Sequence, residues 1–146
     1  MTLEKRILVV DDDDTIRALL RTVLRRRGFR VDSARNGVEA LERMTRCRYS
    51  LIVLDLMMPR MSGYEMLEHL TDAAIRGSAR VLVLTAGIEP RVLNTDFVVG
   101  TIHKPFDIEL FIDAVSGYLA AVDGLTQLEE CAPGNDAGDA QSSRPN

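Results

Sequence analysis

The sequence predicts an α/β fold: an open sandwich in which a parallel, five-stranded sheet is covered by helices on both faces. Five short apolar runs, each typical of a strand, alternate along the chain with segments of helical periodicity. Most of the runs are apolar instead of alternating cleanly with polar residues, which indicates parallel strands buried on both faces. The chain has 146 residues, 46% hydrophobic and 27% charged, enough for one globular domain with a sizeable core.

The first two predicted strands are each followed by a helix. Residues 7–10 ("ILVV") form the first strand, and the helix after it has Asp14 as its expected N-cap and Gly28 just beyond its C-terminal end. Residues 29–34 are the second strand, and 36–44 begin as a turn and continue as a short helix. The apolar face expected for the first helix comprises Ile16, Leu19, Leu20, Val23 and Leu24.

The next two strands are residues 51–56 ("LIVLDL") and 80–85 ("RVLVLT"). Between them, Ser62 and Glu65 stand in the S-x-x-E spacing of a capping box, which predicts a helix that runs to Leu70. This segment therefore continues the strand–helix–strand alternation.

The fifth strand lies within residues 97–103, and the final helix begins after Asp107, its expected N-cap. Residues 123–146 are rich in Gly, Pro, Ser, Asp and Gln and carry five acidic side chains against one basic side chain. We therefore expect one domain over residues 1–122, followed by a disordered acidic tail over residues 123–146.

Composition also narrows the functional classes. The net charge of −4 does not indicate a nucleic-acid partner. The N-terminal residues show no signal-peptide core, and no apolar run approaches 18 residues, so we expect a cytoplasmic protein without membrane insertion. The two cysteines, Cys47 and Cys131, are too few and too far apart for a disulfide framework and are expected as free thiols.

Polar residues follow four of the predicted strands at the point where each strand ends. Asp11 and Asp12 follow the first, Asp55 and Thr85 end the third and fourth, and Lys104 follows the fifth. In an open parallel sheet, ligands bind outside the carboxyl ends of the strands, so these side chains should converge. Three carboxylates in one small pocket need a cation, and a site with few protein oxygens suits Mg²⁺.

Four motifs contain these residues: "ILVVDDD" at 7–13, "LIVLDLMMPRMSG" at 51–63, "LVLTA" at 82–86 and "HKPF" at 103–106. With these motifs, the sequence resembles the receiver domains of two-component response regulators over residues 5 to about 122. The resemblance implies a doubly wound, flavodoxin-like sheet in the strand order 2-1-3-4-5.

The resemblance also implies roles for individual residues. Asp55 would be the phosphoacceptor and, with Asp12 and the backbone carbonyl of Met57, would bind Mg²⁺, with Mn²⁺ as an alternative ion. Asp11 would act through a water molecule or orient the site.

The remaining roles concern the phosphoryl group and the partners. Thr85 would donate a hydrogen bond to a phosphoryl oxygen, and Lys104 would pair with it. The phosphodonor would be a sensor histidine kinase or a histidine phosphotransfer protein. A stand-alone receiver would then signal by protein–protein interaction with an unknown downstream protein.

Two features depart from the family pattern. Thr85 and Lys104 are 19 positions apart, which predicts a shortened or missing fourth helix. Thr101 stands three residues before Lys104, where many receivers carry a Tyr or Phe that turns inward on activation. We therefore expect activation to order the loop over residues 86–98 instead of flipping an aromatic ring.

Two alternatives stay open at this point. Asp11, Asp13 and Thr15 also fit the D-x-D-x-T motif of haloacid dehalogenase phosphatases, which would make Asp11 the nucleophile. This reading leaves Asp55 unexplained, and the acidic residues after Lys104 fall on a helix or in the tail instead of at a strand end. The second alternative is a receiver that serves as a scaffold without phosphorylation.

Overall fold

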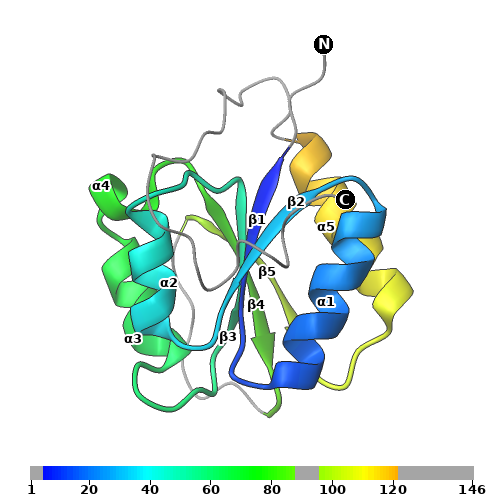
Figure 1. Ribbon diagram of the computed structural model, residues 1–146, viewed down its shortest axis with the longest axis horizontal. Helices are drawn as coiled ribbons and strands as arrows, with labels where there is room; N and C mark the ends of the chain where they lie inside the picture. The colour runs from blue at the N-terminus through cyan, green and yellow to red at the C-terminus, as the bar shows by residue number, and fades with distance from the viewer. Residues whose placement is uncertain (1–4, 88–95, 122–146) are drawn as a thin grey trace.

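Five parallel strands form one sheet in the order β2-β1-β3-β4-β5 (Figure 1), which confirms the predicted fold class and strand order. The computed structural model describes residues 5–87 and 96–121. Every pair of neighbouring strands is parallel, so all five strands end at the same edge of the sheet. The strands are β1 (Arg6–Val10), β2 (Arg30–Ala34), β3 (Leu51–Asp55), β4 (Arg80–Thr85) and β5 (Val98–His103).

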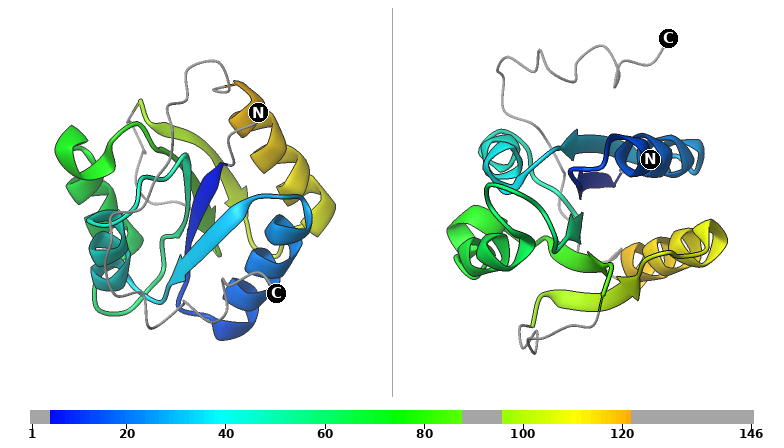
Figure 2. Two further views of the ribbon diagram at one scale, coloured as in Figure 1. Left: turned by 45° about the horizontal axis from the view of Figure 1, so that its top comes forward. Right: turned by 90° about the horizontal axis from the view of Figure 1, so that it is seen from below.

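Helices cover both faces of this sheet, as the doubly wound class requires. Figure 2 shows α1 and α5 on one side, with α2 and α3 on the other. The short α4 lies beside α3, before β4 begins. The helices are α1 (Asp14–Arg26), α2 (Gly37–Met44), α3 (Gly63–Leu70), α4 (Ala73–Arg76) and α5 (Ile108–Ala121).

The strands β1, β3 and β4 are mostly apolar because their successive side chains enter two different cores. Ile7 and Val9 pack beneath α1 and α5 with Leu24 and Phe111. Leu8 and Val10 point to the other face, into the core beneath α2 and α3. One expected core residue differs: Leu19 is 40% exposed and lies at the rim of α1.

The helix ends follow the predicted capping chemistry with one correction. Asp13, not Asp14, is the N-cap of α1, and its carboxylate accepts hydrogen bonds from the amides of Thr15 and Ile16. Asp14 is instead the first helical residue. Gly28 follows the C-cap with φ of 94°, a conformation that favours glycine.

The other predicted caps are confirmed. Ser62 and Glu65 form the reciprocal capping box of α3, which ends at Leu70 as expected. The carboxylate of Asp107 accepts hydrogen bonds from the amides of Glu109 and Leu110 at the start of α5.

The connection between β4 and β5 agrees with a shortened or missing fourth helix. Its described residues, 86–87 and 96–97, are not helical, and residues 88–95 lie outside the described part of the chain. The expected ordering of the loop over residues 86–98 and the expected disordered tail over residues 123–146 therefore fall largely or wholly on undescribed residues. Because α4 precedes β4, it is not the helix that this expectation concerns.

Cys47 is disulfide-bonded, which contradicts the free thiol expected at this position; Cys131 lies outside the described residues. Among the described helices, none combines the length and the apolar character needed to cross a membrane.

Candidate functional site

Three carboxylates meet at the carboxyl edge of the sheet because β1 and β3 are neighbours in register. Asp11 and Asp12 follow β1, Asp55 is the last residue of β3, and one oxygen from each lies within 4.8 Å of the others. Asp11 and Asp55 are buried, whereas Asp12 is exposed. The acid pocket, defined as these three side chains, is therefore closed beneath and open to solvent on the Asp12 side.

Backbone amides hold the two buried carboxylates in place. The amide of Asp13 donates to Oδ1 of Asp11 at 2.9 Å, and the amide of Met57 donates to Oδ1 of Asp55 at 3.1 Å. The side chain of Met57 is 63% exposed, so its contribution to the pocket comes through the main chain. Each carboxylate thus has one oxygen fixed by the loop that follows its own strand.

Lys104, the residue after β5, places its ammonium group beside the same two acids. Its Nζ lies 3.0 Å from Oδ2 of Asp11 and 3.5 Å from Oδ2 of Asp55. Its backbone amide donates to the carbonyl of Thr85 at 2.7 Å, which fixes the residue at the end of β4. The topology therefore brings together Asp11 and Lys104, 93 positions apart in sequence, as predicted.

Thr85 is buried at the end of β4, but its hydroxyl does not contact the carboxylates. Oγ1 lies 3.5 Å from both the amide and the carbonyl of Gly87, a distance at which hydrogen bonds are weak. The hydroxyl can therefore exchange these contacts for a stronger acceptor at small cost.

The electrostatics show that the pocket lacks positive charge. Burial raises the pKa of Asp55 to about 6; the Met57 amide opposes this, and the neighbouring Asp11 carboxylate adds to it. Burial alone would lower the pKa of Lys104, but the Asp11 and Asp55 carboxylates outweigh it and raise that pKa. One ammonium group cannot neutralise three carboxylates.

A divalent cation fits this donor set. The three carboxylates supply hard oxygen ligands, and the exposed Asp12 leaves room for the water molecules that Mg²⁺ retains. The raised pKa of Asp55 indicates an unmet demand for positive charge in the buried part of the pocket.

Two features of this edge were not found by sequence reasoning. One is a mostly apolar groove of about 410 Å³ beside the acid pocket, between the first turns of α1 and α5. The other is Arg17, whose side chain reaches back to the loop after β1. The groove is lined by Ile16, Leu19, Ala86, Lys104, Pro105, Phe106 and Ile108.

The phosphatase alternative is not supported by the geometry. Asp13, the second aspartate of that motif, caps α1 with its carboxylate and is not a member of the acid pocket. Asp55, which that alternative leaves without a role, lies inside the pocket.

A doubly wound parallel sheet with clustered acids and a lysine at its carboxyl edge is the arrangement expected of a phosphoacceptor signalling domain. The family model for the response regulator receiver domain matches residues 7–116, and the chain belongs to this family. Receiver domains are signalling switches in two-component systems and phosphorelays, and are phosphorylated by histidine kinases or phosphotransfer proteins.

The relatives include single-domain and longer proteins. Sporulation initiation phosphotransferase F of Bacillus subtilis is 36% identical over 120 residues, which are 80% of this chain and 95% of that protein. Transcriptional regulatory protein ResD of the same species is 40% identical over 108 residues, covering 72% of this chain but only 44% of ResD. The chain thus spans about half or less of several longer relatives.

Solved structures agree with the fold. The response regulator TrrA of Thermotoga maritima, in complex with Mg²⁺ and BeF, has a TM-score of 0.69 at 34% identity and covers 79% of this chain and 99% of its own. A receiver domain protein from Methanospirillum hungatei has a TM-score of 0.74 at 27% identity, with 82% and 98% coverage.

Proposed function

We propose that this chain is a cytoplasmic single-domain response regulator whose receiver spans residues 1–122. Asp55 accepts a phosphoryl group from a sensor histidine kinase or a histidine phosphotransfer protein in a Mg²⁺-dependent reaction. The observation that supports this most is the position of the Asp55 carboxylate, which is 2% exposed at the end of β3, among two further carboxylates and 3.5 Å from Nζ of Lys104.

The contacts of the two buried acids favour Asp55 over Asp11 as the nucleophile. Both oxygens of Asp11 are engaged, by the amide of Asp13 and by Lys104 at 3.0 Å. Among the described residues, Oδ2 of Asp55 has only the 3.5 Å contact to Lys104, so it is less firmly engaged than either oxygen of Asp11 and is freer to attack. Asp11 is better suited to orient Lys104 and the metal.

The transfer needs little covalent chemistry from the protein. An Asp55 oxygen attacks the phosphorus atom of phosphohistidine; the P–N bond breaks, a P–O bond forms, and the imidazole nitrogen keeps the electron pair. Lys104 then shifts its contact from the Asp55 carboxylate to a phosphoryl oxygen, and Thr85 gives up Gly87 to donate to another. Asp12, Asp55 and the Met57 carbonyl would hold Mg²⁺, which would offset the negative charge of the transferred group.

The apolar groove beside the acid pocket suits the phosphodonor. Ile16 and Leu19 on α1 and Phe106 before α5 offer apolar surface next to Lys104. A donor that buries this surface also keeps bulk water away from the reacting phosphoryl group.

A phosphotransfer assay tests this function. Autophosphorylated histidine kinases are mixed with the wild-type chain or with Asp55→Asn, with and without a Mg²⁺ chelator. Label should move from a cognate kinase to the wild-type chain only when Mg²⁺ is present, and should remain on the kinase with Asp55→Asn. Equal transfer to both chains would overturn the proposal.

A further inference from the structure

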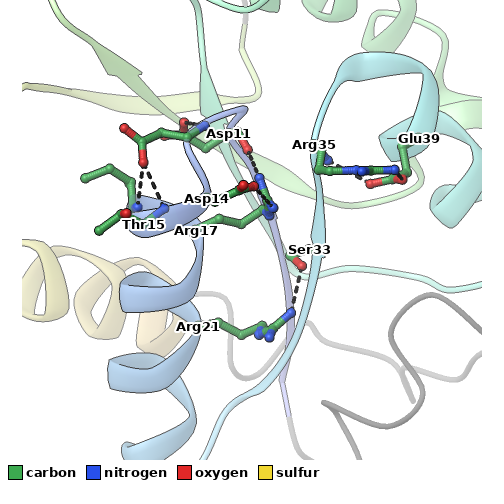
Figure 3. Close-up of polar contacts among 10 residues, drawn as sticks. Asp11, Asp14, Thr15, Arg17, Arg21, Ser33, Arg35 and Glu39 are labelled. Carbon is green, nitrogen blue, oxygen red and sulfur yellow. Dashed lines mark hydrogen bonds and ion pairs between the residues drawn. The ribbon is translucent and has the colours of Figure 1, made fainter.

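Arg17 connects α1 to the loop that carries two of the pocket acids. Its Nη1 donates to the backbone carbonyl of Asp11 at 2.7 Å, and its Nη2 pairs with Oδ1 of Asp14 at 2.5 Å (Figure 3). The Arg17 side chain is only 14% exposed, whereas Asp14 is 85% exposed. The guanidinium group is therefore packed against the loop, with a carboxylate on its outer side.

We propose that Arg17 is a positioning residue for the metal pocket, and this inference rests on the proposed function. By binding the Asp11 carbonyl, it fixes the loop over residues 11–14 in the conformation in which Asp11 and Asp12 both face Asp55. Asp14 in turn steers the guanidinium group of Arg17.

The geometry of the peptide unit explains how one hydrogen bond has this effect. The carbonyl of Asp11 and the amide of Asp12 lie in one rigid plane, so fixing the carbonyl oxygen fixes the direction in which Asp12 leaves the strand. The amide of Asp11 makes the preceding contact, to the carbonyl of Ala34 at 3.2 Å. Beyond that contact the chain has left β1, and Arg17 is the side chain that holds the Asp11 carbonyl.

With this contact in place, the four successive aspartates are divided among three places. Asp11 and Asp12 belong to the acid pocket, and Asp13 caps α1. Asp14 pairs with Arg17. Four adjacent carboxylates are thus tolerated because only two of them enter the site.

A surface ion pair of the (i, i+3) kind would not have this role. Such pairs contribute little to stability and do not orient the main chain. Arg21, one turn further along α1, provides the comparison within the molecule. Its Nη1 contacts Oγ of Ser33 on β2 at 3.0 Å, away from the loop (Figure 3).

The experiment measures Mg²⁺ affinity by calorimetry for the full chain, Arg17→Met, Arg17→Lys and the matched control Arg21→Met. We expect Arg17→Met to weaken Mg²⁺ binding about tenfold or more, the range seen when residues that orient metal ligands are replaced. Arg17→Lys should recover part of the loss, and Arg21→Met should stay within about twofold of wild type. Thermal unfolding of each variant checks that it is folded.

The sign of the change in Mg²⁺ affinity distinguishes a positioning role of Arg17 from a purely electrostatic one. Removing a cation beside three carboxylates makes the pocket more negative and should tighten Mg²⁺ binding, so a weaker affinity reports a lost orientation. Unchanged or tighter binding by Arg17→Met would overturn the inference, as would an equal loss in Arg21→Met. Failure of the wild-type chain to bind Mg²⁺ would overturn the proposed function and this inference together.

Discussion

Replacing Asp55 by Asn should stabilise the metal-free protein, and by more at high pH than at low pH. Burial raises the pKa of the Asp55 carboxyl from 3.8 to about 6, so the unfolded chain releases this proton at a lower pH than the folded chain. The wild-type protein therefore loses stability between about pH 4 and pH 6, and the loss persists above that range. Asn keeps an acceptor for the Met57 amide but has no proton to release.

The magnitude follows from the two pKa values. At about 1.4 kcal/mol for each tenfold change in proton affinity, the difference corresponds to roughly 3 kcal/mol. Asp55→Asn should then exceed the wild type in free energy of unfolding by about 1 kcal/mol at pH 4.5 and by about 3 kcal/mol at pH 8.

Urea unfolding in the presence of a chelator measures this difference. Asp113→Asn, at an exposed position on α5, is the control, and its difference from the wild type in free energy of unfolding should not grow with pH. Added Mg²⁺ should reduce the difference in free energy of unfolding between Asp55→Asn and the wild type, because it binds the folded wild type. An Asp55→Asn advantage that is the same at pH 4.5 and pH 8, or a less stable variant at pH 8, would refute the burial argument.

Three further predictions concern the loops around the pocket. Asp12→Asn should lose most Mg²⁺ affinity in a titration yet unfold at the same or a higher temperature, because it removes an exposed acid from a repulsive cluster. Arg60→Gly should raise the free energy of unfolding in urea by up to about 1 kcal/mol, because Arg60 has φ of 68°; Arg27→Gly, at φ of −89°, should not raise it. Gly63→Ala should cost about 1–3 kcal/mol in urea unfolding, since its Cβ would lie 2.5 Å from the Asp55 carbonyl, whereas Gly117→Ala has open space and should not destabilise.

The sequence predicted the strands and most caps because each rests on local chemistry. Apolar runs and an S-x-x-E spacing have the same consequence in any doubly wound fold. The N-cap of α1 was placed one residue late, at Asp14, because Asp13 and Asp14 are equally good caps. The turn after β1 decides between them, and its conformation depends on contacts that the sequence does not display.

The main residues of the site could also be predicted from the sequence. Parallel strands bring their ends together, so Asp11, Asp55 and Lys104 could be placed at one edge from topology and family resemblance. The role of Arg17 could not be predicted, because it depends on the direction of the Asp11 carbonyl. The groove could not be predicted either, because it lies between the first turns of α1 and α5. One of its lining residues, Leu19, was expected in the core.

The most direct test of the central claim is to identify the residue that is phosphorylated. The chain is incubated with acetyl phosphate and Mg²⁺, any acyl phosphate is reduced with borohydride, and the peptides are analysed by mass spectrometry. Reduction converts a phosphorylated aspartate to homoserine. The geometry of the acid pocket predicts homoserine at position 55, whereas homoserine at position 11, or a phosphorylated chain with Asp55 unchanged, would contradict it.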